Sequence, residues 1–137
     1  MILSEKELRN YLDRVEKLAI QNEDIFAVFL VGSYAKNTAH DESDIDVMIL
    51  TQNSEKYFTE MEWINTFGHV KELRTEKWGI VSTIRVFFEA IEIEFNFCDK
   101  KWIKIPLDEG TLETLKDGFK IIYERNGVLS DVRKIFI

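Results

Sequence analysis

The sequence predicts an α/β protein in which helices pack on a mixed β-sheet. Three observations support this fold class: a segment near the N-terminus has the spacing of an amphipathic helix, the apolar run after it has the length of a strand, and alternating segments follow later. The order of helix, strand, helix, strand, helix and further strands is typical of a sheet covered by helices. With 137 residues, we expect one domain that spans residues 1–137.

The first half of the chain contains the clearest elements. Ser4-Glu5-Lys6-Glu7 has the pattern of a capping box, and apolar residues then recur at helical spacing, which predicts a helix over residues 5–20. The apolar run 25–31 predicts a buried strand that Gly32 ends, and residues 44–49 alternate as in a second strand. The other elements expected in this half are a short helix over 33–39, a loop over 40–43 and a helix that Ser54 caps and that continues through Ile64.

In the second half, Val81–Phe88 and Ile91–Phe97 are the clearest strands. Glu89-Ala90 is a link short enough for a hairpin, although it lacks the glycine or asparagine that tight hairpin turns prefer. A short helix over 111–116 and a last strand over 119–123 are expected next. After a loop at Asn126-Gly127, the stretch 128–137 ends in apolar residues, which either form an interface or pack back on the domain.

Composition excludes several classes of function. The formal charge is −7, from 18 basic and 25 acidic side chains, so extended binding of nucleic acid is disfavoured. The longest apolar run is seven residues, too short to span a bilayer, and the first residues lack the pattern of a secretion signal. Cys98 is the only cysteine, which excludes an intramolecular disulfide and favours the cytoplasm; no cluster of cysteine and histidine suggests zinc.

Gly32-Ser33 stands where a buried strand ends and a helix is expected to begin. The first turn of a helix offers N–H groups without intrahelical partners and the positive end of the helix dipole, which suits a phosphate group. Gly32 lets the backbone approach closely, and the Ser33 hydroxyl adds a hydrogen-bond donor. These two residues are therefore the candidate phosphate-binding site.

Asp44 and Asp46 follow at a fixed distance and are two residues apart on an expected strand, so both carboxylates face the same side. Two adjacent carboxylates repel each other, and a hard divalent cation such as Mg²⁺ relieves the repulsion while it binds substrate phosphates. At average residue usage, Gly-Ser with Asp-x-Asp at one gap has odds on the order of 1 in 100,000 per position. The combination predicts a site with two metal ions.

A third carboxylate is expected from another strand. In residues 91–97 the apolar side chains share one face, and Glu92, Glu94 and Asn96 share the other. The same alternation would also describe an ordinary strand with one solvated face. Beside the aspartate pair we take Glu92 as the third metal ligand, with Glu94 in reserve.

Together, Gly32-Ser33, Asp44-Ile45-Asp46 and the later acidic strand resemble the DNA polymerase beta-type nucleotidyltransferase superfamily. Within it, the chain is similar to small bacterial proteins related to aminoglycoside and lincosamide nucleotidyltransferases and to minimal antitoxin nucleotidyltransferases. The resemblance covers roughly residues 25 to 125, and segments 34–39, 43–46, 63–68 and 91–95 carry it. It implies the nucleotidyltransferase fold, with a mixed sheet.

The resemblance also implies a reaction: Mg²⁺-dependent transfer of a nucleoside monophosphate, AMP from ATP in the leading interpretation, to a hydroxyl of a small molecule or a protein. Asp44, Asp46 and Glu92 would be catalytic and hold two Mg²⁺ ions, with Mn²⁺ as a substitute. Gly32, Ser33, Lys36 and Ser43 would bind the nucleotide. The alternatives are an antitoxin-type transferase that acts on a partner toxin, and a nucleotide-binding protein without turnover.

The related antibiotic-modifying enzymes usually carry a further helical domain that completes the acceptor pocket, and these 137 residues contain none. We therefore expect a homodimer or a complex with a helical protein partner. Other conspicuous residues receive ordinary interpretations: His40 as a loop histidine, Cys98 as an inert thiol, and the tryptophans as core or interface residues. The tryptophans are Trp63, Trp78 and Trp102.

Overall fold

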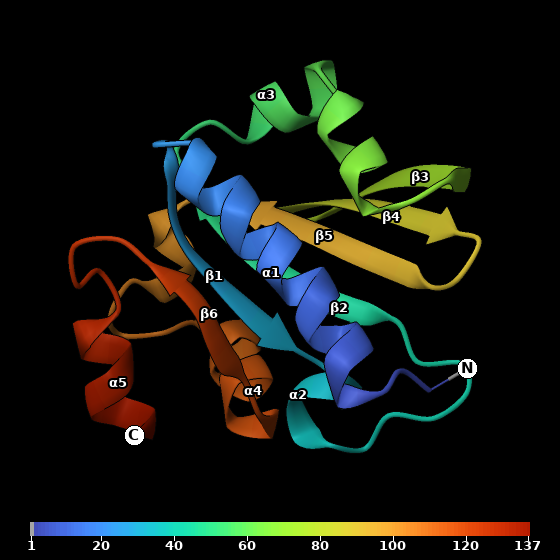
Figure 1. The fold of residues 1–137 in the computed structure, drawn as a ribbon. Helices are drawn as coiled ribbons and strands as arrows, with labels where there is room; N and C mark the ends of the chain where they lie inside the picture. Colours follow the sequence, from blue (N-terminus) through green and yellow to red (C-terminus); the bar gives the residue numbers. More distant parts are fainter. Residues whose placement is uncertain (1) are drawn as a thin grey trace.

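The computed structural model describes residues 2–137 as helices that cover both faces of a central sheet (Figure 1). In chain order the elements are α1 (Glu5–Gln21), β1 (Ile25–Val31), α2 (Ser33–Lys36), β2 (Ile45–Thr51), α3 (Ser54–Thr59), the 3-10 helix η1 (Glu62–Phe67), β3 (Val70–Trp78), β4 (Val81–Phe88), β5 (Glu92–Cys98), the 3-10 helix η2 (Lys100–Ile103), α4 (Glu109–Asp117), β6 (Lys120–Glu124) and α5 (Ser130–Phe136).

The sheet has six strands in the order β3-β4-β5-β2-β1-β6. Strands β2 and β5 are parallel, and the other four neighbouring pairs are antiparallel, so the predicted mixed sheet is confirmed. The parallel pair lies in the middle and joins Asp46 directly to Glu94 in its register. The topology therefore brings the two acidic segments side by side, although they are far apart in sequence.

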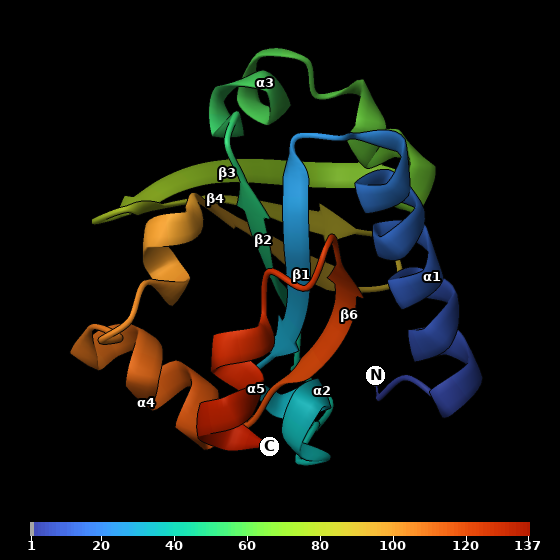
Figure 2. The same cartoon turned by 90° about the vertical axis from the view of Figure 1, so that its left-hand side faces the viewer.

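Each face of the sheet has its own core (Figure 2). On one face α1, α3 and η1 cover strand residues such as Val28, Ile49 and Phe95. On the other face η2, α4 and α5 cover Phe29 and Leu50. Alternation along each strand produces this division, because successive side chains point to opposite faces.

The N-terminal half follows the prediction with two corrections. The capping box is present: the Glu7 N–H donates to the Ser4 hydroxyl, and the Ser4 N–H donates to the Glu7 carboxylate. The helix predicted over 33–39 ends earlier, at Lys36, because Asn37 adopts a left-handed conformation with φ 60°. The helix predicted from Ser54 through Ile64 breaks after Thr59 into α3 and η1, and Ser54 is its first residue rather than its cap.

Strand β3 was not predicted. Its nine residues are mostly charged and exposed, because it is an edge strand with few apolar partners, so apolar alternation is weak. Gly79, with φ 61°, sits in the turn that joins β3 to β4. The hairpin predicted between Val81–Phe88 and residues 91–97 is confirmed, and the Phe88 N–H donates to the Ile91 carbonyl at 2.9 Å.

The C-terminal stretch packs back on the domain as α5. Leu129 and Val132 are fully buried, and the Phe136 ring meets Phe119 edge-on, with ring centroids 5.7 Å apart. Ile135 and Ile137 remain 49% and 84% exposed, so only part of the apolar tail is covered. None of the helices in residues 2–137 is long and apolar enough to cross a membrane.

Candidate functional site

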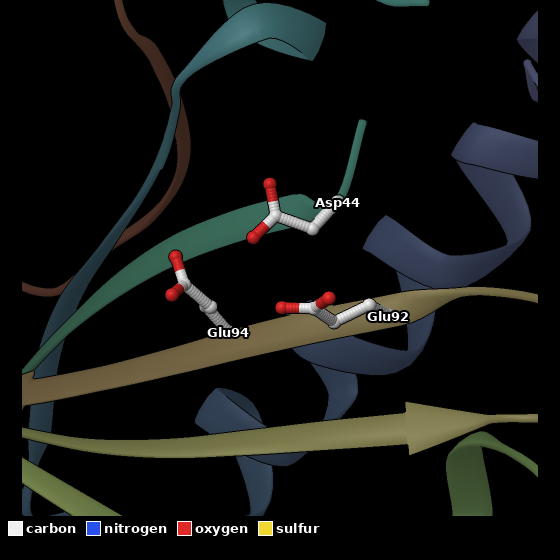
Figure 3. Close-up of side chains that lie close together, drawn as sticks. All are labelled: Asp44, Glu92 and Glu94. Atoms are coloured by element: carbon white, nitrogen blue, oxygen red, sulfur yellow. The ribbon is translucent and has the colours of Figure 1, made fainter. Parts of the chain in front are cut away.

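The acidic residues of β2 and β5 meet at one end of the parallel pair. Asp44 immediately precedes β2, whereas Glu92 and Glu94 lie on the same face of β5. One carboxylate oxygen from each of these three residues lies within 4.8 Å of the other two. Figure 3 shows the three side chains turned toward one another across the gap between the strands. Both candidate glutamates therefore lie close to Asp44, and their binding of a metal ion stays a prediction.

Asp46 occupies the next position along the same edge. It pairs with Glu94 in the parallel register, and its Oδ1 accepts a hydrogen bond from Asn96 Nδ2 at 2.6 Å. The same amide donates to the Val47 carbonyl, and Asn96 Oδ1 accepts from the Thr83 hydroxyl. Asn96 thereby fixes the orientation of the Asp46 carboxylate while leaving its second oxygen available.

The carboxylates of the cluster are partly buried and repel one another, and a bound cation would reduce that repulsion. Burial, and then the charge of Asp44, raise the pKa of Asp46 to about 6. Burial, followed by Asp46 and Asp44, raises the pKa of Glu94 to about 7. Burial and Asp44 also raise the pKa of Glu92. Each carboxylate therefore loses solvation and faces other negative charges when it ionises.

Arg85 on β4 supplies positive charge at the edge of this cluster. Its Nη2 donates to Glu94, and its Nε lies 3.4 Å from a Glu92 oxygen and 3.6 Å from a Glu76 oxygen. Glu76 comes from β3, so three neighbouring strands contribute to the arrangement. One guanidinium thus faces more carboxylates than it can neutralise.

Gly32 is required where β1 passes into α2. Its φ is 76°, a conformation that side chains rarely adopt, and a Cβ atom there would lie 3.3 Å from Asp46 Cβ. Ala35 and Lys36 donate to the Gly32 carbonyl as the helix begins, so the N–H groups of Ser33 and Tyr34 belong to the first turn. The predicted phosphate-binding residues therefore lie directly beside Asp46.

The two other predicted nucleotide-binding residues are engaged with the protein. The Ser43 hydroxyl is buried and accepts from the His40 N–H at 2.9 Å, which closes the turn before Asp44. Lys36 Nζ lies 2.8 Å from an Asp117 oxygen at the end of α4. Contacts of both residues with a nucleotide stay predictions, and Ser43 has an evident role in positioning the loop.

Two clefts open on the α4 side of the sheet, and both border Asp46. The first has a volume of about 440 Å³ and is lined by Val31, Gly32, Asp46, Glu113, Thr114 and Asp117. The second, of about 370 Å³, extends from Asp46 past Asn96 to Trp78, Ile80 and Trp102. Asp46 therefore stands between a polar space beside Gly32 and a more apolar space beside the β3–β4 turn.

The three tryptophans and the cysteine differ in their exposure to solvent. Trp63 is half-buried and packs on the core, edge-on to Phe95 with ring centroids 4.9 Å apart, and Trp102 is buried against Phe29. Trp78 differs, because it is 65% exposed and lines the second cleft. Burial raises the pKa of the Cys98 thiol, which agrees with an inert cysteine.

The donor set fits hard divalent cations. Carboxylate oxygens from Asp44, Glu92 and Glu94 converge within 4.8 Å, and Asp46 adds a fourth carboxylate beside them. Mg²⁺ and Mn²⁺ favour oxygen ligands and are bound through a few carboxylates together with substrate phosphates. The arrangement can therefore hold metal ions next to the polar cleft at Gly32.

Sequence reasoning missed Arg85 and Glu76 as parts of the site. Glu76 lies on the unpredicted strand β3, so nothing in its local pattern placed it near the cluster. Arg85 alternates with Ile84 and Val86 inside a predicted strand, and the hairpin register pairs it with Glu94. A charged residue in the middle of an apolar strand, opposite an acid across a hairpin, was the signal available.

Comparison with known proteins identifies the family and supports the fold. The family model described as polymerase beta, nucleotidyltransferase, matches residues 13–85. A protein from Methanocaldococcus jannaschii, provisionally named a protein adenylyltransferase, is 29% identical over 126 residues, which cover 90% of this chain and 77% of that protein.

Among solved structures, an aminoglycoside 6-adenyltransferase from Bacillus subtilis superposes with a TM-score of 0.55 at 14% identity, over 74% of this chain and 37% of that chain. The polymerase core of the RNA surveillance complex TRAMP gives a TM-score of 0.52 at 14% identity, over 69% and 32%. This chain thus spans about a third of the length of the solved structures that it matches, and the likeness to them concerns the fold.

Proposed function

Because the chain belongs to the polymerase beta nucleotidyltransferase family, we propose that it transfers AMP from ATP to a hydroxyl group in a reaction that depends on Mg²⁺. Membership makes the protein a transferase of nucleotides. The donor, the metal and the acceptor are the parts that we propose. The name of the M. jannaschii relative favours ATP as the donor and a protein hydroxyl as the acceptor.

One observation carries the proposal: four carboxylates converge beside a glycine that opens a helix. Asp46 is the link, because it pairs with Glu94 across the sheet and also lines the same cleft as Gly32. A triphosphate held at Gly32 and Ser33 would therefore place its phosphates next to the acidic cluster. This geometry supports transfer of a nucleotidyl group better than it supports nucleotide binding alone.

The protein residues have separable roles in this reaction. Gly32 and Ser33 bind the triphosphate through N–H groups and a hydroxyl, and the carboxylates of Asp44, Asp46 and a glutamate of β5 hold two divalent cations. When bound, the cations neutralise phosphate charge and favour ionisation of the acceptor hydroxyl. The acceptor oxygen bonds to the α-phosphorus, the bond to the bridging oxygen breaks, and pyrophosphate leaves. A cluster carboxylate takes the hydroxyl proton.

Glu94 is favoured over Glu92 as the third metal ligand. The charges of Asp46 and Asp44 both raise the pKa of Glu94, whereas Asp44 is the aspartate that raises the pKa of Glu92. Only Glu94 lies opposite Asp46 in the strand register. The prediction that Glu92 is the ligand stays open to test: Glu94→Gln should abolish transfer and Glu92→Gln should reduce it. Normal turnover by Glu94→Gln together with a dead Glu92→Gln would reverse the assignment.

A binding partner and a location complete the proposal. The exposed side chains of Ile135 and Ile137 on and after α5 support a homodimer or a complex with a helical protein. The single cysteine supports a cytoplasmic location, and the acidic charge argues against extended nucleic acid as the acceptor. Light scattering after size exclusion tests the homodimer.

The deciding experiment is a transfer assay with mass spectrometric readout. The protein is incubated with each of the four ribonucleoside triphosphates and Mg²⁺, against a panel of small hydroxyl compounds and a native protein extract. We expect acceptors to gain the mass of one AMP and pyrophosphate to be released. Asp44→Asn and Asp46→Asn are the controls, because each removes a metal ligand. Failure of all nucleotides to react or to bind in the presence of Mg²⁺ would contradict the proposal.

Two alternatives give different results in the same assay. An antitoxin-type transferase would modify one partner protein and leave the small compounds unmodified, and a gene for a small helical toxin would stand beside its own. A nucleotide-binding protein without turnover would bind ATP and release no pyrophosphate. The intact pair Asp44 and Asp46 disfavours the second alternative, because two adjacent carboxylates are costly to keep without a cation.

A further inference from the structure

Arg85 holds an unusual position within the acidic cluster. Its Nη2 donates to Glu94, while its Nε lies 3.4 Å from an oxygen of Glu92 and 3.6 Å from an oxygen of Glu76. Within residues 2–137 this Nε is the buried side-chain nitrogen that makes no hydrogen bond. One donor is therefore engaged with a candidate metal ligand, and a second donor lies within ion-pair distance of two other carboxylates without a hydrogen bond to either.

The electrostatic setting explains why a guanidinium is present. Arg85 is the cation that acts to lower the pKa of Asp46 and of Glu94, whereas Glu92 is influenced by both Arg85 and Arg74, the register partner of Arg85 on β3. A buried donor without an acceptor is itself unfavourable. Its position near one carboxylate oxygen of Glu92 and one of Glu76 indicates that the side chain has a second arrangement available.

We propose that Arg85 is a positioning residue that exchanges carboxylate partners when the site binds a divalent cation; the inference rests on the proposed function. In the metal-free protein the guanidinium neutralises Glu94. When Glu94 coordinates a cation, the Arg85 guanidinium remains in place through ion pairs of its Nε with Glu92 and Glu76. Glu94 is then a metal ligand, and Glu92 is the anchor of Arg85. The two glutamates on one face of β5 thereby have different roles.

Binding of Mn²⁺ without turnover tests the exchange directly. The affinity of Mn²⁺ is measured by electron paramagnetic resonance for the wild type and for Arg85→Met, which keeps the length of the side chain and removes its charge. We expect the Kd of Mn²⁺ to fall about three- to tenfold, because the ion no longer displaces a guanidinium from Glu94. Unchanged or weaker binding by Arg85→Met would overturn the proposal.

Arg133→Met is the matched control. It makes the same change in net charge and breaks an ion pair with Glu124 on the α5 side of the molecule. We expect its Mn²⁺ affinity to equal that of the wild type. A gain equal to that of Arg85→Met would show that net charge alone controls the affinity, which also contradicts a specific role for Arg85.

A double-mutant cycle separates an anchor from a ligand. In the wild-type background, Glu92→Gln should weaken Mn²⁺ binding, because Arg85 then stays on Glu94. In the Arg85→Met background, Glu92→Gln should have no effect, since there is no guanidinium to retain. An equal loss in both backgrounds would make Glu92 a metal ligand and refute the exchange. Glu94→Gln should abolish binding in both.

Failure of the proposed function would give a different result. If the wild type binds no Mn²⁺ even with ATP present, the metal-dependent reaction is excluded. The neutralisation of Glu94 by Arg85 in the metal-free protein is then tested by the melting temperature in EDTA. The melting temperature of Arg85→Met should then be lower than that of Arg133→Met. The difference between the two melting temperatures should decrease in 1 M salt, because salt screens the repulsion between the carboxylates. Equal melting would overturn that role. If Arg85→Met does not fold, Arg85→Lys replaces it, with smaller effects in the same direction.

Discussion

Replacement of Asp46 by asparagine should stabilise the metal-free protein. Burial and Asp44 raise the pKa of Asp46 from 3.8 to about 6, a difference that corresponds to about 3 kcal/mol of free energy of unfolding. Because the folded state binds the proton more tightly, the wild type loses stability as the pH rises from about 4 to about 6, and it stays less stable above that range. Asparagine carries no charge and can still accept the hydrogen bond from Asn96.

The free energy of unfolding is measured by urea titration in EDTA at pH 4 and pH 8. We expect Asp46→Asn to exceed the wild type by about 1–3 kcal/mol at pH 8 and to match it near pH 4. Mg²⁺ should reverse the order, because it stabilises only the protein that binds it. Asp117→Asn, an exposed acid of the same cleft, is the control and should gain nothing. A variant less stable than the wild type at pH 8, or a difference independent of pH, would refute the reasoning.

Three further predictions follow from other contacts. ATP should bind far more tightly with Mg²⁺ than with EDTA; equal affinities by calorimetry would exclude the metal site. Gly32→Ala should lower the free energy of unfolding by about 1–3 kcal/mol and lower the rate of transfer, because the backbone has a positive φ and the added Cβ would lie 3.3 Å from Asp46 Cβ. Gly79→Ala, where φ is positive but the space is open, should lose less stability. Equal losses of stability in urea titrations would contradict this. Burial acts to raise the pKa of Asp24, but hydrogen bonds from Thr51 and two other side chains lower it overall, so Asp24→Asn should lose about 1–3 kcal/mol at pH 7. The difference in free energy of unfolding between the wild type and Asp24→Asn should decrease below pH 4, because the wild type loses this stabilisation when the Asp24 carboxylate is protonated. A difference that stays constant from pH 3 to 7 would contradict the ionic contribution.

Local sequence patterns were sufficient to predict most of the helices and strands. The capping box and helical spacing located α1 almost to the residue, an uninterrupted apolar run located β1, and alternation of apolar and polar residues located β5. Strand β3 was not predicted, because an edge strand needs few apolar side chains and a charged, exposed sequence resembles a loop. The break between α3 and η1 escaped because the apolar residues Tyr57, Met61 and Ile64 keep helical spacing across it.

The site was predictable to the extent that its residues lie on one strand or one turn. Asp44 and Asp46 lie close in sequence, so their shared side followed from strand geometry. The choice between Glu92 and Glu94 did not follow, because both lie on one face of β5 and only the pairing of Asp46 with Glu94 distinguishes them. Arg85 enters the cluster through contacts between strands, so the register of the β4–β5 hairpin indicates its place, whereas the pattern of β4 alone does not.

The strand order has a mechanical consequence. Strands β3, β4 and β5 form one antiparallel half of the sheet, and β2, β1 and β6 form the other; a single parallel seam between β2 and β5 joins them. Parallel pairing is slightly weaker per residue than antiparallel pairing. A cation held by Asp44 and Glu94 would bridge that seam, one ligand from each half, and act as a staple. Hydrogen exchange along β2 and β5 should therefore slow on metal binding more than exchange along the outer strands β3 and β6.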